Sequence, residues 1–131
     1  MQYLYLTKNK LIKLNSEIFS GLVSLVTLHL SNNLFKDFDL NNLKFLSKLQ
    51  YLYLEDCAIE TIRNGSLNSL RMLIELSLRN NKIDFKETFY LFNQTSSLNY
   101  LYLYDNELET IKKETFHGLK TLLKLDLQNN T

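Results

Sequence analysis

The sequence has few of the residues that usually build turns and cross-links. Its 131 residues include three glycines, no proline, no tryptophan and one cysteine, Cys57. A single cysteine excludes an intramolecular disulfide framework. A fold with many independent turns normally uses more glycine and proline. The chain is therefore either mostly helical or builds its turns with a device that recurs along the sequence.

Long apolar runs and an excess of one charge are also missing. No apolar stretch approaches the ~18 residues of a membrane-spanning helix, so we expect no direct membrane insertion by this segment. The N-terminus alternates and is interrupted by Lys8, Lys10 and Lys13, so it lacks the apolar core of a signal peptide. The net charge of +1, without a basic stripe, argues against nucleic acid as a partner.

What the sequence does contain is an internal repeat. Six aligned starting positions are separated by 24, 24, 24, 25 and 24 residues. The positions three and five residues after each start hold only leucine: Leu4, Leu6, Leu28, Leu30, Leu52, Leu54, Leu76, Leu78, Leu101, Leu103, Leu125 and Leu127. We predict one array over 1–131, with repeats 1–24, 25–48, 49–72, 73–97, 98–121 and a partial repeat 122–131.

A second column lies between these leucines. It reads Asn9, Asn33, Cys57, Asn81, Asn106 and Asn130. An asparagine amide both donates and accepts hydrogen bonds, so in register it can satisfy the turn backbone of its own and the neighbouring repeat. We interpret this structural ladder as the device that replaces glycine and proline. Cys57 fills one rung as a small buried group.

The pattern L-x-x-L-x-L-x-x-N/C-x-L resembles the leucine-rich repeat, in its 24-residue class. Phe19-Ser20-Gly21-Leu22 and Phe116-His117-Gly118-Leu119 are similar to the F-x-G-L signature of that class. The resemblance implies an α/β solenoid, with a curved parallel sheet on its concave face and short helical or irregular convex segments. It also implies a protein-binding module of a cell-surface or secreted receptor or adhesion protein, as in Toll-like receptors and Slit-like proteins. Because the polar end caps that a solenoid needs are missing, we expect a fragment of a longer protein.

Side chains between the leucines should point outward, because strand side chains alternate. Seven of the eight tyrosines fall there, and tyrosine is enriched at binding hot spots. The candidate ligand-binding residues are Tyr3, Tyr5, His29, Tyr51, Tyr53, Glu55, Arg79, Tyr100, Tyr102 and Tyr104. An alternative is that the tyrosines only stiffen the sheet. Glu55 and Arg79 share a column, which predicts a cross-strand ion pair, and the face leans acidic, which favours a partner with basic surface.

The fourth repeat departs from the pattern. It is one residue longer, and Thr95 stands where other repeats have leucine. Phe85, Phe89 and Phe92 fall at helical spacing, which predicts a longer convex helix with buried phenylalanines; the alternative is an aromatic bulge offered to a partner.

Two sequons, Asn64-Gly65-Ser66 and Asn93-Gln94-Thr95, lie in return segments. Asn64 and Asn93 are candidate N-glycosylation sites, although sequons also arise by chance in a chain rich in Asn, Ser and Thr. A glycan there would not block the concave face. The sequons are compatible with an extracellular or cell-surface glycoprotein.

Nothing in the sequence converges on a catalytic site. His29 and His117 are predicted on opposite sides, Cys57 is predicted buried, and neither metal-ligand spacing nor a glycine-rich phosphate loop is present. We therefore predict a non-enzyme without a cofactor, whose partner is another protein. Two alternatives stay open: an intracellular (cytoplasmic) scaffold or adaptor, with which the unpaired cysteine is consistent, and a regulatory arm of a larger protein.

Overall fold

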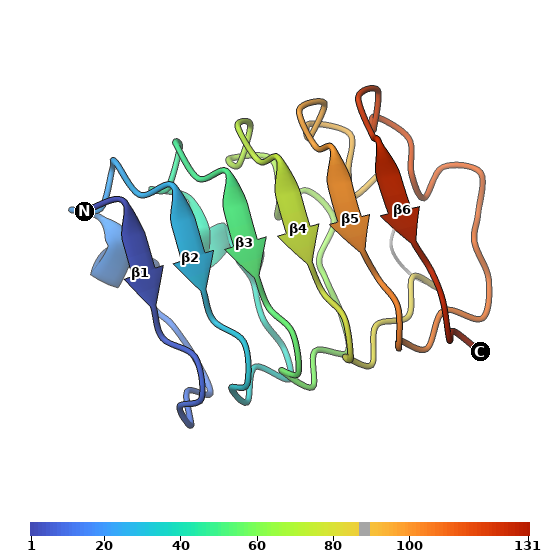
Figure 1. The fold of residues 1–131 in the computed structure, drawn as a ribbon, viewed down its shortest axis with the longest axis horizontal. Helices are drawn as coiled ribbons and strands as arrows, with labels where there is room; N and C mark the ends of the chain where they lie inside the picture. Colours follow the sequence, from blue (N-terminus) through green and yellow to red (C-terminus); the bar gives the residue numbers. More distant parts are fainter. Residues whose placement is uncertain (87–89) are drawn as a thin grey trace.

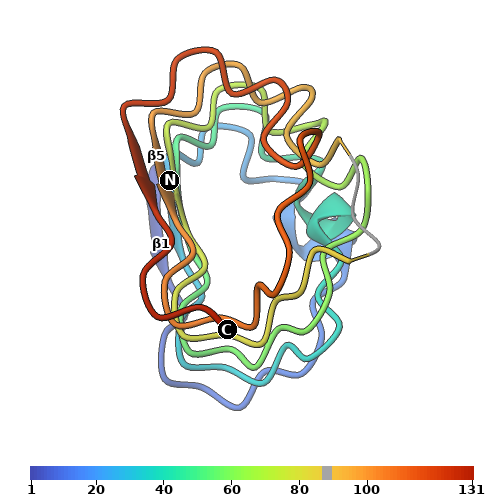
Figure 2. The ribbon, with the colours of Figure 1, turned by 90° about the vertical axis from the view of Figure 1, so that its right-hand side faces the viewer.

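A computed structural model describes residues 1–86 and 90–131. Six strands form one parallel sheet in the order β1-β2-β3-β4-β5-β6. The strands are β1 (Tyr3–Tyr5), β2 (Thr27–His29), β3 (Tyr51–Tyr53), β4 (Glu75–Ser77), β5 (Tyr100–Tyr102) and β6 (Lys124–Asp126). Figure 1 shows them side by side, with the two termini at opposite ends of the row. Figure 2 looks along the row and shows the chain winding in superimposed turns, each of which returns behind the sheet.

The register of the sheet follows the sequence repeat. Leu28 pairs with Leu52, and Leu52 pairs with Leu76, so equivalent positions of successive repeats lie side by side. The longer fourth repeat keeps the same register, because Leu76 pairs with Leu101. The predicted parallel sheet is therefore confirmed, and the extra residue is accommodated behind it.

The leucines of the repeat form the core. Leu28, Leu30, Leu52 and Leu54 are completely buried. Burying a leucine side chain stabilises a fold by roughly 1.5–3 kcal/mol, and each turn contributes several such side chains. Leu4 in the first turn is only partly buried, because a turn at the edge of the array is covered on one side.

The asparagine ladder is confirmed in its hydrogen bonds. The Asn81 amide nitrogen donates to the carbonyl oxygens of Leu54 (2.8 Å) and Leu78 (2.9 Å), which belong to neighbouring repeats. Its oxygen accepts from the backbone N–H groups of Cys57 (3.1 Å) and Ile59 (3.0 Å). One side chain thus satisfies four backbone groups that bend away from the sheet.

Cys57 occupies its rung without an amide. Its Sγ lies 3.4 Å from the carbonyl oxygen of Leu30 and 3.2 Å from that of Glu55, so its single S–H offers one weak donation where an asparagine amide offers two. The side chain is completely buried, and this burial raises the pKa of the thiol to about 11. Cys57 therefore lies in the ladder as the small buried group that the sequence predicts.

A further part of the turn device was missed at the sequence level. The residue before each ladder position has a left-handed backbone, with φ between 50° and 60° in all six turns. These residues are Lys8, Asn32, Asp56, Asn80, Asp105 and Asn129. Asparagine and aspartate tolerate this conformation better than other non-glycine residues. Three of the six are joined by amide–carboxylate hydrogen bonds, because the side chains of Asn32 and Asn80 both donate to Asp56.

The convex side has two short 3-10 helices, η1 (Ser16–Phe19) and η2 (Leu40–Leu43). Each begins after a capping side chain: Asn15 accepts from the N–H of Glu17 at 3.1 Å, and Asp39 accepts from the N–H of Asn41 at 2.9 Å. Such caps satisfy backbone donors that have no partner in the first turn. In the part of the chain that the structure describes, the later return segments consist of turns, which agrees with the expected mixture of helical and irregular segments.

The longer convex helix predicted for the fourth repeat is wrong for the described residues. Residues 90–98 form successive turns, and Tyr90 has a φ of 57°, which a right-handed helix does not accept. Phe85 and Phe92 are nevertheless buried, with ring centroids 6.3 Å apart in an edge-to-face contact. Phe89 lies outside the described residues. Thr95 is also buried, and its hydroxyl donates to the Phe92 carbonyl at 2.9 Å.

Candidate protein-binding face

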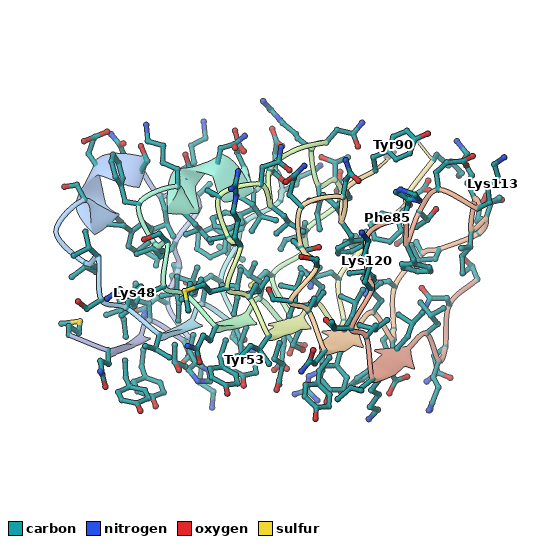
Figure 3. All side chains as sticks on the ribbon, turned by 90° about the horizontal axis from the view of Figure 1, so that it is seen from above. Lys48, Tyr53, Phe85, Tyr90, Lys113 and Lys120 are labelled. Carbon is teal, nitrogen blue, oxygen red and sulfur yellow. The ribbon has the colours of Figure 1, made fainter. Side chains whose placement is uncertain are left out.

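Outward-pointing side chains of the six strands form one continuous surface. Figure 3 shows the strands in a gently bowed row, with Tyr53 pointing away from the body of the molecule on the hollow side of the bow. We call this surface the concave face. Its two inner columns read Tyr3, Thr27, Tyr51, Glu75, Tyr100, Lys124 and Tyr5, His29, Tyr53, Ser77, Tyr102, Asp126.

Over β1 to β3 the concave face is aromatic and carries no formal charge in these columns. The rings of Tyr5 and His29 stack with centroids 4.8 Å apart, and those of His29 and Tyr53 stack at 4.3 Å. Burial lowers the pKa of His29 below its ordinary value of 6.5, and the nearby Glu55 carboxylate opposes this only partly. His29 is therefore neutral at pH 7, and the stack consists of three uncharged rings. Tyr5 keeps 64% of its surface exposed.

Tyr53 joins this aromatic stack to the charged half of the face. Burial of its hydroxyl, together with a hydrogen bond to Glu75 and the charge of that carboxylate, raises the pKa of Tyr53 to about 12. The hydroxyl therefore stays protonated and can donate throughout the physiological range. The contact fixes Glu75 on β4 against β3.

Over β4 to β6 the concave face is polar. Glu55 accepts from the Ser77 hydroxyl at 2.7 Å, and its other oxygen lies 3.1 Å from the Arg79 Nε. Arg79 also donates to the Tyr104 hydroxyl at 2.7 Å. The predicted cross-strand ion pair between Glu55 and Arg79 is confirmed, and it extends to the tyrosine of the next repeat.

A second cation of the face is held in the same manner. The Lys124 ammonium lies 4.9 Å from the centroid of the Tyr102 ring and 3.9 Å from the Asp126 carboxylate. Cations within about 6 Å of a tyrosine centroid are attracted by the face of the ring. Both basic residues of this half of the face therefore lie against a tyrosine and a carboxylate.

A hollow of about 350 Å³ opens in this polar half. Its lining includes Glu55, Glu75, Ser77, Tyr102, Lys124 and Asp126. Ser77 is the small member of a column in which its neighbours are Tyr53 and Tyr102, so the surface drops between two large rings. Sequence reasoning missed this hollow, although the serine interrupting an aromatic column was the signal that could have indicated it.

All ten predicted contact residues lie on the concave face, on the strands or two residues beyond them. The sequon asparagines lie elsewhere. Asn64 and Asn93 are exposed and line one depression of about 350 Å³ together with Tyr90, and Figure 3 shows Tyr90 on the side opposite Tyr53. Ser66 and Thr95, the hydroxyl residues of the two sequons, are completely buried.

The remaining chemistry-bearing side chains are dispersed. His117 makes an edge-to-face contact with Tyr90 (5.8 Å between centroids), whereas His29 stacks on Tyr53, and Figure 3 shows these two tyrosines on opposite sides. Among residues 1–86 and 90–131, no three His, Cys, Asp or Glu side chains are grouped as metal ligands. Within the same residues, no helix has the length and hydropathy needed to span a bilayer.

Comparisons with known proteins agree with this architecture. A leucine-rich-repeat family model matches residues 1–59 and 90–131. No curated protein matches the chain by sequence. A leucine-rich-repeat protein of Leptospira interrogans has a similar structure, with a TM-score of 0.86 and 31% identity over 99% of this chain. TLR13, solved as a complex with ssRNA13, has a TM-score of 0.75 and 28% identity, also over 99% of this chain.

This chain spans 32% of the first of these proteins and 22% of the second. The family model covers well over half of the chain, and its two matched segments include the strands β1 to β3 and β5 to β6. The chain belongs to the leucine-rich-repeat family, whose fold is a protein-interaction scaffold.

Proposed function

We propose that the chain is the recognition segment of a cell-surface or secreted protein, and that it binds another protein through the concave face. The observation that carries this proposal is the outward-pointing stack of Tyr5, His29 and Tyr53, in which Tyr5 is exposed and the other two rings are half-buried. Rigid, amphipathic rings on a regular sheet lose little conformational entropy on binding, and tyrosine is enriched at binding hot spots. The stack is uncharged at neutral pH, so covering it with a partner costs little desolvation.

The location of the sequons supports an extracellular context. Asn64 and Asn93 are exposed and line one depression with Tyr90, on the side opposite Tyr53, where glycans would leave the concave face free. The buried Ser66 and Thr95 do not prevent glycosylation, because the transferase modifies a chain before it has folded. Similarity to TLR13 is compatible with the same context.

Binding is tested with the purified chain and a fixed panel of immobilised extracellular proteins. The Tyr51→Ala/Tyr53→Ala variant is expected to lose the interactions of the wild type, while Tyr90→Ala keeps them because Tyr90 is an exposed tyrosine on the opposite side. Equal loss in both variants, or interactions that survive in both, would count against the concave face. Circular dichroism of each variant shows whether the fold is kept.

The extracellular context is tested separately. The chain is secreted from eukaryotic cells behind an added signal peptide, and its mass is measured before and after glycosidase treatment. Occupied Asn64 and Asn93 support a secreted or cell-surface parent. A folded, secreted and unglycosylated chain makes the sequons accidental and favours the cytoplasmic scaffold or adaptor instead.

TLR13 was solved with ssRNA13, and this raises RNA as a second class of ligand. The hollow of the concave face carries three carboxylates and one ammonium group. A phosphodiester backbone is recognised by clustered lysine and arginine side chains, which this surface lacks. The concave face therefore favours a protein over a nucleic acid.

A further inference from the structure

We infer that the hollow over β4 to β6 receives a lysine or arginine side chain of the protein partner. This inference rests on the proposed function and specifies the chemistry of the partner at one position. The hollow measures about 350 Å³, at the lower end of the size range of small-ligand sites, so it fits one long side chain and not a larger body.

Charge complementarity is the first argument. The lining contains three carboxylates, from Glu55, Glu75 and Asp126, and one ammonium group, from Lys124. Glu55 is paired with Arg79 and Asp126 with Lys124, so among the lining carboxylates the charge of Glu75 is left unbalanced. The wall also contains the ring of Tyr102. A surface of tyrosine and carboxylate groups attracts an incoming cation and repels an anionic one.

The chain's own cations show how such a group is held. The Arg79 guanidinium carbon lies 5.8 Å from the Tyr104 centroid, and its Nε lies 3.1 Å from Glu55. Lys124 is held in a similar way: its ammonium nitrogen lies 4.9 Å from the centroid of the Tyr102 ring and 3.9 Å from a carboxylate oxygen of Asp126. Two tyrosine–carboxylate pairs of the face therefore each hold a basic side chain from the chain itself.

Tyr53 and Glu75 form a third tyrosine–carboxylate pair, but no basic side chain of the described residues is held between them. Glu75 is half-buried on the wall of the hollow and accepts a hydrogen bond from the Tyr53 hydroxyl. Within residues 1–86 and 90–131, no ion pair includes Glu75 and no cation–π contact includes Tyr53. A half-buried carboxylate is best satisfied by a cation, and the partner is placed to supply it.

Ser77 makes this position reachable. It occupies the centre of the aromatic column, its side chain is small, and its hydroxyl is already committed to Glu55. A lysine or arginine extended across Ser77 brings its charged end to Glu75 while its methylene groups cover the ring of Tyr102. A fixed basic anchor would also set the register of a partner along the row of strands.

The test uses displayed random peptides selected on the full chain. Peptides whose binding is lost in Tyr51→Ala/Tyr53→Ala are expected to share a lysine or arginine at one position. Replacing that arginine by citrulline, its neutral analogue, should weaken binding about 10- to 100-fold, the range of a hot-spot contact. Glu75→Gln/Asp126→Asn should cause a similar loss, since glutamine still accepts from Tyr53 but carries no charge.

The matched control is Glu17→Gln/Glu107→Gln, which removes two exposed carboxylates outside the concave face and should leave the affinity unchanged. Peptides that need Tyr51 and Tyr53 but share no basic residue, or that bind Glu75→Gln/Asp126→Asn normally, overturn this inference and leave the proposed function intact. Failure to select any peptide that depends on the concave face contradicts both. Displacement of the peptide by single-stranded RNA in a way that requires Lys124 would also overturn the inference.

Discussion

Gly118 provides the sharpest test of how tightly the turns of this solenoid stack. It belongs to the segment Phe116-His117-Gly118-Leu119, and the same pattern occurs at Phe19-Ser20-Gly21-Leu22. A Cβ atom at Gly118 would lie 2.4 Å from the carbonyl oxygen of Phe92 and 2.8 Å from the Asn93 Cα, both backbone atoms of the preceding repeat. The same atom at Gly21 would meet nothing within 4 Å.

The expected cost of Gly118→Ala has two parts. Gly118 has a φ of 101°, and a left-handed backbone costs an L-residue roughly 1–2 kcal/mol. Forcing one repeat away from the next adds about 1–3 kcal/mol, the usual range for overpacking. The more restricted unfolded chain returns about 0.4–1 kcal/mol of this. Gly118→Ala should therefore destabilise by about 3 kcal/mol, whereas Gly21→Ala receives only the stabilising contribution.

The free energy of unfolding of both variants is measured by urea titration monitored by circular dichroism, and the slope of each transition is compared as well as its midpoint. A smaller slope for Gly118→Ala would show that the last repeats open before the rest. The reasoning is refuted if both alanine variants shift the free energy of unfolding by the same amount, or if Gly118→Ala is as stable as the wild type.

Three further predictions concern the ladder, the aromatic stack and the thiol. Asn81→Ala should lower the free energy of unfolding by at least about 1–3 kcal/mol, because it leaves buried backbone groups unpaired, and Asn9→Ala should change it far less, because Asn9 is exposed and bonds only within its own repeat; similar urea midpoints for the two variants would contradict this. The folded-state pKa of His29 is lowered, so its contribution to the free energy of unfolding should be fully present above the unfolded pKa of about 6.5 and should decline as the pH falls below that value. A wild type that loses no more stability than His29→Gln between neutral and acidic pH would count against the stack. Cys57 should react with a thiol reagent only as fast as the chain unfolds, given its burial and its pKa of about 11; rapid labelling of the native protein would contradict its place in the ladder.

The inner side of each turn could be predicted from the sequence because each residue there has one function. The leucines three and five residues after the start of each repeat are completely buried in the central repeats, and asparagine is the side chain that satisfies donors and acceptors together. The wrong prediction concerns the convex side, where the backbone conformation is not set by the periodic pattern of the strands. Phe85 and Phe92 suggested a helix through their spacing, yet the left-handed Tyr90 between them is incompatible with one.

The concave face could be predicted as a set of residues but not as a surface with two halves. Alternation places Tyr5, His29 and Tyr53 in one column, and stacking follows from the strand spacing. The hollow depends on how large side chains lean around Ser77, which is a matter of rotamers and not of pattern. The left-handed residues of the turns also form a column in the sequence, but a scarcity of glycine does not indicate where non-glycine residues adopt a positive φ.

The assignment of binding to the concave face is tested most directly by attaching a bulky label to one face of the protein at a time and measuring binding. Cys57 is buried and the pKa of its thiol is raised, so we expect a cysteine introduced at an exposed position to be labelled alone with a polyethylene glycol maleimide. Tyr51→Cys lies at the centre of the concave face, and Asn68→Cys lies beside the sequon depression on the opposite side. If the concave face is the binding surface, the label on Tyr51→Cys abolishes binding to the extracellular panel relative to the unlabelled variant, and the label on Asn68→Cys does not. Binding that survives the first label and is lost with the second would contradict the assignment of function to the concave face.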